Sequence, residues 1–488
     1  MLHIRESAHE VVFDDDLPPS TPSKSKFRIT RTYTPYTRKR LYLLLGSFFA
    51  IATILVLSVE TPRAYTRDDI SSQPTSHNQS TLLFTDDYPP WVRGAPTQSF
   101  RDNLRPEVQY ITSWLSAGWN NDVMTYMNLI YLGMITDRVP VVAMFVPMHI
   151  GSDAPPLFFG DVFDIPRFTR ESGYPLLEWH EVKDMRSDTW DDIGCWDIWE
   201  AVQYGEHHAR PSVVPEFLRL DISYTKAPGW IKMIPNYEHD KGASFWSLAR
   251  LAYPDDREKN LGDIHASPLH HALLNPDEHM LCYDYLYYVG ASITSEYDYA
   301  YSPAWRYVGK HLHFTAKVRD IARQYVTKSF GLPQTAPLPA YITIHVRHGD
   351  FKDWCWDAEK PEDCFAPLSV IARRVKEVQD ELLDKKHIHV PMNRVIMTSD
   401  ESDPKWWAEV EALGWVKMDH GAMKTEERYG RWYPVILDAA IQAGGAGFVG
   451  TDRSTFSMLS RRRVLDWNSG ATRMFKWGKK GADDHQDE

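Results

Sequence analysis

A histidine and an arginine two residues apart, at the end of an apolar run, are the first side chains in this sequence with the spacing for chemistry. The run is ITIHVRHGDF, residues 342–351. Side chains alternate along a strand, so one face would carry Thr343, His345 and Arg347 together. Ligands bind open α/β sheets at the carboxyl ends of the strands, and a guanidinium fork suits phosphate. The spacing therefore predicts an anion site; the alternative is a surface arginine paired with an acid.

A second candidate is the turn in AGFVGTDRSTFSMLSRRR, where the apolar strand 446–450 gives way to a helix at 453–463. The strand breaks at Gly450, and residues that cap helices follow it. A helix N-terminus rich in hydroxyls binds anions, and Ser454 and Thr455 can donate to a phosphate. A plain capped helix is the alternative.

Two weaker candidates lie elsewhere in the chain. Gly118-Trp119-Asn120-Asn121 combines a glycine that permits a tight turn with amides that both donate and accept hydrogen bonds. Asp438, in VILDAAIQAGGAG, lies on the predicted helix before the Gly450 strand. Most aspartates on helices are exposed to solvent, so Asp438 indicates a site only in combination with the other motifs.

Alternating strands and helices must position these residues. Val123, Met127, Ile130 and Met134 recur at helical spacing, and VPVVAMFV is typical of a strand buried on both faces. The region from about 150 to 305 is less periodic and is predicted only as mixed. From there on the sequence predicts, in order, helix 311–329, strand 340–347, a helix with Leu368 to Leu382 on one face, strand Arg394–Ser399, helix 404–412, strand Trp415–Met418, helix 433–443, strand 446–450 and helix 453–463. This alternation indicates βαβ units and a parallel sheet.

Taken together, these motifs resemble the GDP-fucose protein O-fucosyltransferase family. The resemblance rests on H-x-R after a strand, an aspartate on a helix, F-V-G-T-x-x-S-T-F-S opening the last helix, and the early G-x-N-N turn. It covers roughly residues 107–465, although the middle of that range carries no recognisable motif. It implies an α/β fold of GT-B type with two facing Rossmann-like domains, and an inverting, metal-independent transfer of fucose in a lumenal compartment.

The resemblance also implies roles for particular residues. His345, Val346 and Arg347 would hold the diphosphate of GDP-fucose, and Arg347 would be the catalytic group. Asp438 would contact the guanosine part. Ser454, Thr455 and Phe456 would complete the nucleotide pocket, while the segment Ser116, Ala117, Gly118, Trp119 and Asn120 would face the sugar from the other domain.

One position departs from the family pattern. Some members carry a glutamate just before the first-motif glycine as the base, and here that position is Ala117. Another group such as Asp122 or Asp350 could serve, or the reaction could be free of a base, or the chain could act on something other than a protein.

Three other functions compete. Arg347-His348-Gly349 matches the phosphohistidine phosphatase signature, but the His-Asp and His-Ala pairs of this chain all lie upstream, which is the wrong order for the second catalytic histidine. A binding protein that kept the fold without turnover is supported by Ala117. A GT-B enzyme that uses another nucleotide sugar shares fold and site type, and sequence separates it poorly.

Composition narrows the partners. The chain has 488 residues, 43% hydrophobic, with a net charge of −12, which disfavours a nucleic-acid surface. No Asp-x-Asp pair, the usual metal holder of GT-A enzymes, occurs after residue 16, and no C-x-x-C pair indicates zinc. We therefore expect no metal and no cofactor beyond the donor substrate.

One segment predicts a membrane anchor. Leu41–Val59 is 19 uncharged residues, the length of a transmembrane helix. Residues 21–40 carry seven Lys/Arg and no acid, so the positive-inside rule puts the N-terminus in the cytosol. A cleaved signal peptide would need a shorter head and a small-residue cleavage site, and a buried core helix is the other alternative. We expect a single-pass type II protein of the Golgi or endoplasmic reticulum, with a glycoprotein or glycan acceptor.

These observations predict the domain organisation. A disordered cytosolic tail (1–40), the anchor (41–59) and a stem (60–105) precede an N-terminal acceptor-side domain (106–309), a C-terminal GDP-sugar-binding domain (310–475) and a polar tail (476–488). Asn78-Gln79-Ser80 is a glycosylation sequon in the stem.

The four cysteines, Cys195, Cys282, Cys355 and Cys364, all follow the anchor. An even count in an oxidising compartment favours disulfides. Three pairings are possible, and we favour Cys355–Cys364 with Cys195–Cys282; free buried thiols are the alternative.

Overall fold

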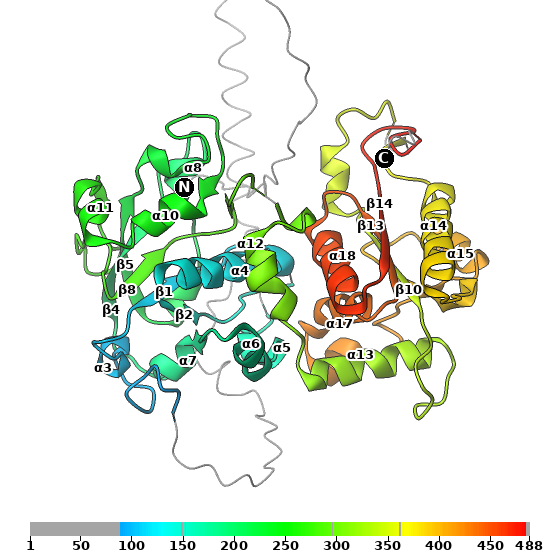
Figure 1. Ribbon diagram of the computed structural model, residues 1–488, viewed down its shortest axis with the longest axis horizontal. Helices are drawn as coiled ribbons and strands as arrows, with labels where there is room; N and C mark the ends of the chain where they lie inside the picture. The colour runs from blue at the N-terminus through cyan, green and yellow to red at the C-terminus, as the bar shows by residue number, and fades with distance from the viewer. Residues whose placement is uncertain (1–87, 148–149, 152, 295, 361–362, 485–488) are drawn as a thin grey trace, which may run out of the picture. The chain divides into compact units, whose positions relative to one another are not determined.

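The structure is a computed structural model, which describes residues 88–147, 150–151, 153–294, 296–360 and 363–484 (Figure 1). The predicted cytosolic tail, the anchor Leu41–Val59 and the sequon at Asn78 lie outside this range. No helix within it is both long and apolar enough to cross a membrane.

The first half of the described chain contains short helices and strands in irregular succession. In chain order they are α3 (Phe100–Asn103), β1 (Tyr110–Ser113), α4 (Trp119–Thr136), β2 (Val139–Val142), α5 (Phe159–Val162), α6 (Ile165–Ser172), β3 (Leu177–Glu178), α7 (Trp179–Val182), β4 (Asp191–Asp197), α8 (Trp199–Val202), α9 (Val214–Phe217), β5 (Leu220–Lys226), the 3₁₀ helix η1 (Gly229–Ile231), β6 (Ala243–Ser244), α10 (Phe245–Arg250), α11 (Pro254–Lys259), β7 (Ile264–His265), β8 (Met280–Tyr283), β9 (Val289–Gly290), η2 (Glu296–Asp298), α12 (Pro303–Tyr307) and η3 (Gly309–His311).

The second half alternates more regularly. Its elements are α13 (Ala316–Ser329), β10 (Ile342–Val346), η4 (Asp350–Trp354), α14 (Leu368–Lys386), η6 (Met392–Arg394), β11 (Val395–Ser399), α15 (Pro404–Ala412), β12 (Val416–Lys417), α16 (Thr425–Tyr429), α17 (Tyr433–Ala443), β13 (Gly447–Thr451), α18 (Thr455–Asn468) and β14 (Ala471–Phe475). The predicted helices at 404–412 and 433–443 have these bounds, whereas the helix expected from 311 begins only at Ala316.

Each half is built on its own sheet. The seven-stranded sheet of the first half has the order β3-β2-β1-β8-β4-β5-β7, and only β7 runs antiparallel to its neighbour. The sheet of the second half has the order β12-β11-β10-β13-β14, with every pair parallel. The expected α/β class with parallel sheets is therefore present in both halves.

The order of the second sheet defines a switch point. Counted along the chain its strands are arranged 3-2-1-4-5, the order of a doubly wound nucleotide-binding sheet. The order reverses between β10 and β13, and α14 lies on one face of these strands while α17 and α18 lie on the other (Figure 1). Loops that leave neighbouring strands in opposite directions leave a crevice at such a point, which is where ligands bind.

The faces of β10 divide as its alternation predicts. Ile342, Ile344 and Val346 pack with the apolar side of α14 in one hydrophobic cluster. Thr343 faces α17 and donates toward the carbonyl of Gln442. The polar face of this central strand is therefore turned toward α17 and α18.

The folded region includes residues 88–105, which we expected to belong to the stem. Phe100 is fully buried and packs edge-on against Trp179, and Leu104 is also buried. The Ser99 hydroxyl donates to Asp191 at 2.5 Å. Residues 88–105 thus belong to the first half, because their apolar side chains complete its core.

The end of the chain is likewise packed. Asp483 is buried and accepts hydrogen bonds from Arg373 and Arg374 on α14. Residues 476–484 are therefore attached to the second half, which corrects the expectation of a polar tail.

Both favoured disulfides are present. Cys195–Cys282 joins the neighbouring strands β4 and β8. Cys355–Cys364 closes the loop that follows β10 and η4. In the described part of the chain no cysteine is left free.

Candidate functional site

His345 lies at the carboxyl end of β10 and is enclosed by α18. Its Nδ1 is 2.7 Å from the Ser457 hydroxyl, and its ring stacks on Phe456 with a centroid distance of 4.7 Å. Burial, helped by the charge of Arg347, lowers the pKa of His345 to about 3, so the imidazole is neutral at physiological pH. The Ser457 hydroxyl also accepts from the Thr451 N–H, so one side chain holds both the imidazole and the end of β13. His345 is thus an oriented neutral side chain.

Arg347 lies just beyond the strand. Its backbone N–H donates to the Thr451 hydroxyl at 2.9 Å, which fixes the end of β10 against the end of β13. Its guanidinium pairs with Asp350 at 2.7 Å and with Asp400 at 2.9 Å. The described structure therefore has the acid-paired arginine that we gave as the alternative, although at the switch point and with its side chain still 37% exposed. A guanidinium carries more donors than these two pairs consume.

Val346 contributes differently from its neighbours. Its side chain is buried in the cluster against α14, on the face of β10 opposite His345. Only its backbone can face a ligand at the crevice.

The turn between β13 and α18 lies beside the end of β10 at the switch point. Ser454 is the N-cap of α18, and its hydroxyl accepts from the Ser457 N–H at 3.5 Å. Thr455 and Phe456 open the helix and are both half-buried. Because the first N–H groups of a helix carry partial positive charge, this end of α18 favours an anion.

The early glycine turn is held by polar contacts on both sides. Arg210 donates to the Ser116 hydroxyl at 3.2 Å and to its carbonyl at 2.9 Å. The Ala117 N–H donates to Asp122, which is buried in the first turn of α4, and Gly118 is the N-cap of that helix. These bonds fix the segment at the carboxyl end of β1.

Trp119 connects this turn to the second half. Its ring lies 6.5 Å from Phe456 and stacks on Phe163 at 6.3 Å between centroids. Asn120 follows it and is buried, and its Oδ1 has no hydrogen-bond partner among the described residues. Three of the four predicted motifs therefore meet through Trp119, Phe456 and His345.

Asp438 is engaged elsewhere. On α17 it accepts from His420 Nε2 at 2.8 Å, and His420 contacts the Thr425 hydroxyl, which in turn bonds Tyr325. Burial opposes a charge on His420, but the carboxylate of Asp438 outweighs it and raises the pKa of His420. No contact joins Asp438 to His345 or Arg347 in the part of the chain described.

The two guesses for a base do not suit that role. Burial raises the pKa of Asp122 well above its usual range, but the side chain is enclosed and already holds the Ala117 N–H. The carboxylate of Asp350 already forms an ion pair with Arg347.

His348, the histidine of the phosphatase signature, already has side-chain partners. Its Nδ1 is 2.7 Å from Glu401, and its ring packs against Phe365 and Trp406. Its backbone N–H donates to Asp400, which also pairs with Arg347, so both residues are held by the segment that follows β11.

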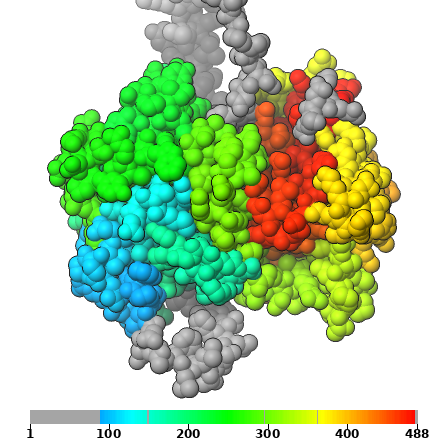
Figure 2. Space-filling model, viewed as in Figure 1, coloured from blue at the N-terminus to red at the C-terminus, as the bar shows by residue number. Residues whose placement is uncertain are grey.

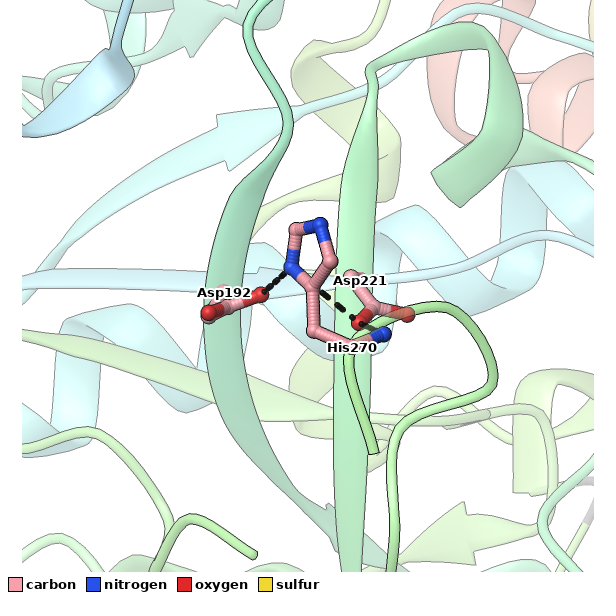
Figure 3. Close-up of side chains that lie close together, drawn as sticks. All are labelled: Asp192, Asp221 and His270. Atoms are coloured by element: carbon pink, nitrogen blue, oxygen red, sulfur yellow. Dashed lines mark hydrogen bonds and ion pairs between the residues drawn. The ribbon is translucent and has the colours of Figure 1, made fainter. Parts of the chain in front are cut away.

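Two groups of carboxylates and histidines in the first half have the spacing of metal ligands. Figure 3 shows the first, Asp192 and Asp221 from the neighbouring strands β4 and β5 with His270 from the loop after β7. Asp221 already accepts from Ser267 and from two backbone N–H groups, so it anchors this loop.

The group in Figure 3 also lies away from the switch point. Asp192 and Asp221 are the second residues of their strands and therefore lie at the amino edge of the sheet. The second group is Asp197, Glu200 and His265, at the carboxyl end of β4. There the Glu200 carboxylate already pairs with Lys226 and contacts His265.

Sequence reasoning missed the partners that organise the crevice. Asp400 directly follows β11, and the rule that singled out Arg347, a polar residue at a strand's carboxyl end, could have found it. Arg210 lies in the aperiodic middle region, where no local signal connects it to Ser116.

Among known proteins, similarity to this chain was found only in solved structures. No family model and no curated protein matches the chain. The apo form of POFUT1 is 13% identical, with a TM-score of 0.47 over 76% of this chain and 99% of that one. POFUT1 in complex with GDP-fucose is 11% identical, with a TM-score of 0.47 over 77% and 99%. The fucosyltransferase NodZ from Bradyrhizobium is 13% identical, with a TM-score of 0.36 over 73% and 93%. At these identities and TM-scores the likeness is one of overall structure and carries nothing about substrate or activity.

Proposed function

We propose that the protein is a type II membrane glycosyltransferase that transfers fucose from GDP-fucose to a hydroxyl of a protein or glycan, in the lumen of the Golgi or endoplasmic reticulum. The observation that carries the proposal is the switch point between β10 and β13. There the Arg347 N–H donates to the hydroxyl of Thr451, the last residue of β13, and the N-terminus of α18 follows at Thr455. The choice of GDP-fucose follows from the motif resemblance.

The arrangement supports an inverting reaction in which protein groups stabilise the leaving diphosphate. When the bond from the anomeric carbon to the β-phosphate oxygen breaks, negative charge develops on the diphosphate. Arg347 and the N–H groups of α18 meet that charge, and they are already oriented before the reaction. His345 stays neutral, because burial lowers its pKa to about 3. The acceptor oxygen attacks the opposite face of the sugar.

The test uses the full-length protein in detergent. Arg347→Ala should lower the rate of GDP release from GDP-fucose by about 10²–10³-fold, the usual loss for one oriented donor. Thermal unfolding should change little, because the side chain is partly exposed. Arg250→Ala is the matched control, since Arg250 also pairs with an aspartate but lies on the surface.

Other outcomes would contradict parts of the proposal. If calorimetry detects no binding of GDP or GDP-fucose, the nucleotide site is refuted. Preference for a UDP-sugar would refute GDP-fucose as the donor. Loss of activity in the presence of a chelator would refute the metal-independent mechanism.

A non-catalytic binding protein is the second candidate, and Ala117 favours it because the family's glutamate is missing. Such a protein would bind GDP-fucose without releasing GDP. The same two measurements therefore separate the candidates.

A further inference from the structure

Transfer to a hydroxyl releases one proton, and the described structure leaves that proton without an evident acceptor. Ala117 has no side-chain base, Asp122 is enclosed, and Asp350 is bound to Arg347. A general base would be a carboxylate or imidazole near the switch point with a free acceptor oxygen or nitrogen.

Asp298 is a carboxylate where the two halves contact each other. It ends η2, a 3₁₀ turn of the first half that packs against α18 of the second half. Its Oδ1 lies 3.6 Å from Nη1 of Arg461, one of the arginines of α18. In the space-filling view the light-green segment that contains η2, α12 and η3 lies beside the orange-red α18 (Figure 2).

The turn that carries Asp298 is fixed to the helix of the early glycine motif. Tyr297 is buried, and its hydroxyl contacts the Met124 carbonyl at 3.0 Å and Asn128 at 2.5 Å, both on α4. Glu296 accepts the N–H groups of Ala291 and Ser292. Asp298 therefore stands between α4, which begins at Trp119, and α18, which begins at the anion-favouring turn.

The Asp298 carboxylate is close to one cation but remains partly exposed. Oδ1 is buried and has no hydrogen-bond partner among the described residues, while the side chain as a whole is still 32% exposed. One oxygen therefore rests near Arg461, and the rest of the group stays accessible.

The charges around Asp298 come from α18 and the turn before it. Burial raises the pKa of Asp298, and the charge of Asp452 adds to the rise, whereas Arg461 and Arg462 oppose it. Asp452 directly follows β13, so the carboxylate that raises the pKa of Asp298 comes from the other half, at the switch point. A carboxyl group whose pKa is raised is a better proton acceptor near neutral pH than an ordinary aspartate.

We propose that Asp298 is the general base that takes the proton from the acceptor hydroxyl. This inference rests on the proposed function. The acceptor O–H bond breaks, its proton passes to the Asp298 carboxylate, and the oxygen bonds the anomeric carbon. The bond from that carbon to the β-phosphate oxygen breaks at the same time, and its electron pair leaves with GDP. The proton is later lost to solvent.

The experiment measures GDP release from GDP-fucose with water as the acceptor, using the full-length protein from pH 5 to 9. Asp298→Asn should lower the rate by about 10²–10⁴-fold, the usual contribution of a general base. GDP affinity by calorimetry should stay within about twofold, because the base does not contact the diphosphate. Asp298→Glu should recover part of the rate.

The pH profile gives a readout that a purely structural role would not move. The base works only when deprotonated, so the wild-type rate should rise with pH through the raised pKa of Asp298. Asp298→Asn should lose this ascending limb. Asp256→Asn, at an arginine-paired surface aspartate of the same half, should keep both rate and profile.

The remaining outcomes separate the two proposals. If the wild type binds no GDP, the proposed function itself fails. If the wild type releases GDP and Asp298→Asn keeps the rate within about threefold or keeps the ascending limb, Asp298 is not the base. Loss of the limb in Asp452→Asn alone would assign the role to the other carboxylate. GDP binding without release in the wild type would support the non-catalytic candidate and overturn this inference.

Discussion

At the scale of single residues, Arg463 is a buried cation without an acidic partner among the described residues. It is 1% exposed, and Nε, Nη1 and Nη2 all lack hydrogen-bond partners among the described residues. Its guanidinium lies over the rings of Phe314 at 4.9 Å and Trp467 at 5.8 Å. Burial lowers the pKa of Arg463 to about 9, so the side chain is still charged at neutral pH. Aromatic faces return roughly 0.5–2 kcal/mol of the cost of burying this charge.

We therefore expect Arg463→Met to stabilise the protein. A buried charge without a partner costs several kcal/mol, and methionine fills a similar volume without that cost. The free energy of unfolding should rise by roughly 1–4 kcal/mol, measured by urea denaturation of the full-length protein. Arg462→Met is the matched control and should lower stability, because Arg462 donates to Asp466 at 3.2 Å. A loss of stability in Arg463→Met would show that the aromatic contacts outweigh the cost of burial.

At the scale of elements, the close approach of β13 and α18 builds the crevice. A Cβ at Gly450 would lie 2.7 Å from Cβ of Ser457 and 2.6 Å from the Phe448 ring. Ser457 is the residue that contacts both His345 and the Thr451 N–H. Glycine at 450 therefore allows the helix to reach the strand end.

Gly450→Ala should push α18 away from β13. We expect a loss of roughly 1–3 kcal/mol in the free energy of unfolding, the usual cost of overpacking. GDP affinity should fall as well, because the helix N-terminus moves with Ser457. Gly94→Ala should be neutral in both measurements, since a Cβ there meets no atom within 4 Å. Unchanged GDP affinity in Gly450→Ala would argue against a ligand at this helix end.

The same elements show what sequence can predict. Local patterns predict the periodic helices of the second half and the two faces of β10. The apolar face of β10 packs with α14, and its polar face contacts α18, so side-chain polarity alternates along the strand. The first half gave few such signals, since strands as short as β3 and β7 are separated by irregular chain. Partners distant in sequence were also invisible. Asp400 meets Arg347 and Asp298 meets Arg461 only through the fold.

At the scale of the whole molecule, α18 joins the two α/β halves. Its first turn lines the crevice, while near its end Trp467 donates to the Lys310 carbonyl at 2.7 Å and stacks on His313. The Trp305 indole donates to Asp466 on the same helix. One helix therefore carries the anion-favouring turn and also fixes the segment that leads from η2 into the second half.

The membrane arrangement can be tested on the intact chain. With Leu41–Val59 as a type II anchor, everything after Val59 should lie in the lumen, because the basic residues flank the anchor on its N-terminal side. In sealed microsomes, added protease should remove only the N-terminal tail. Endoglycosidase should increase the mobility of the wild type but leave Asn78→Gln unchanged, since Asn78 would carry the glycan. If the protease instead digests residues 88–484 in sealed vesicles and only the tail is protected, the orientation is the opposite of the predicted one. The disulfides Cys195–Cys282 and Cys355–Cys364 would then lie outside the oxidising compartment in which disulfides form.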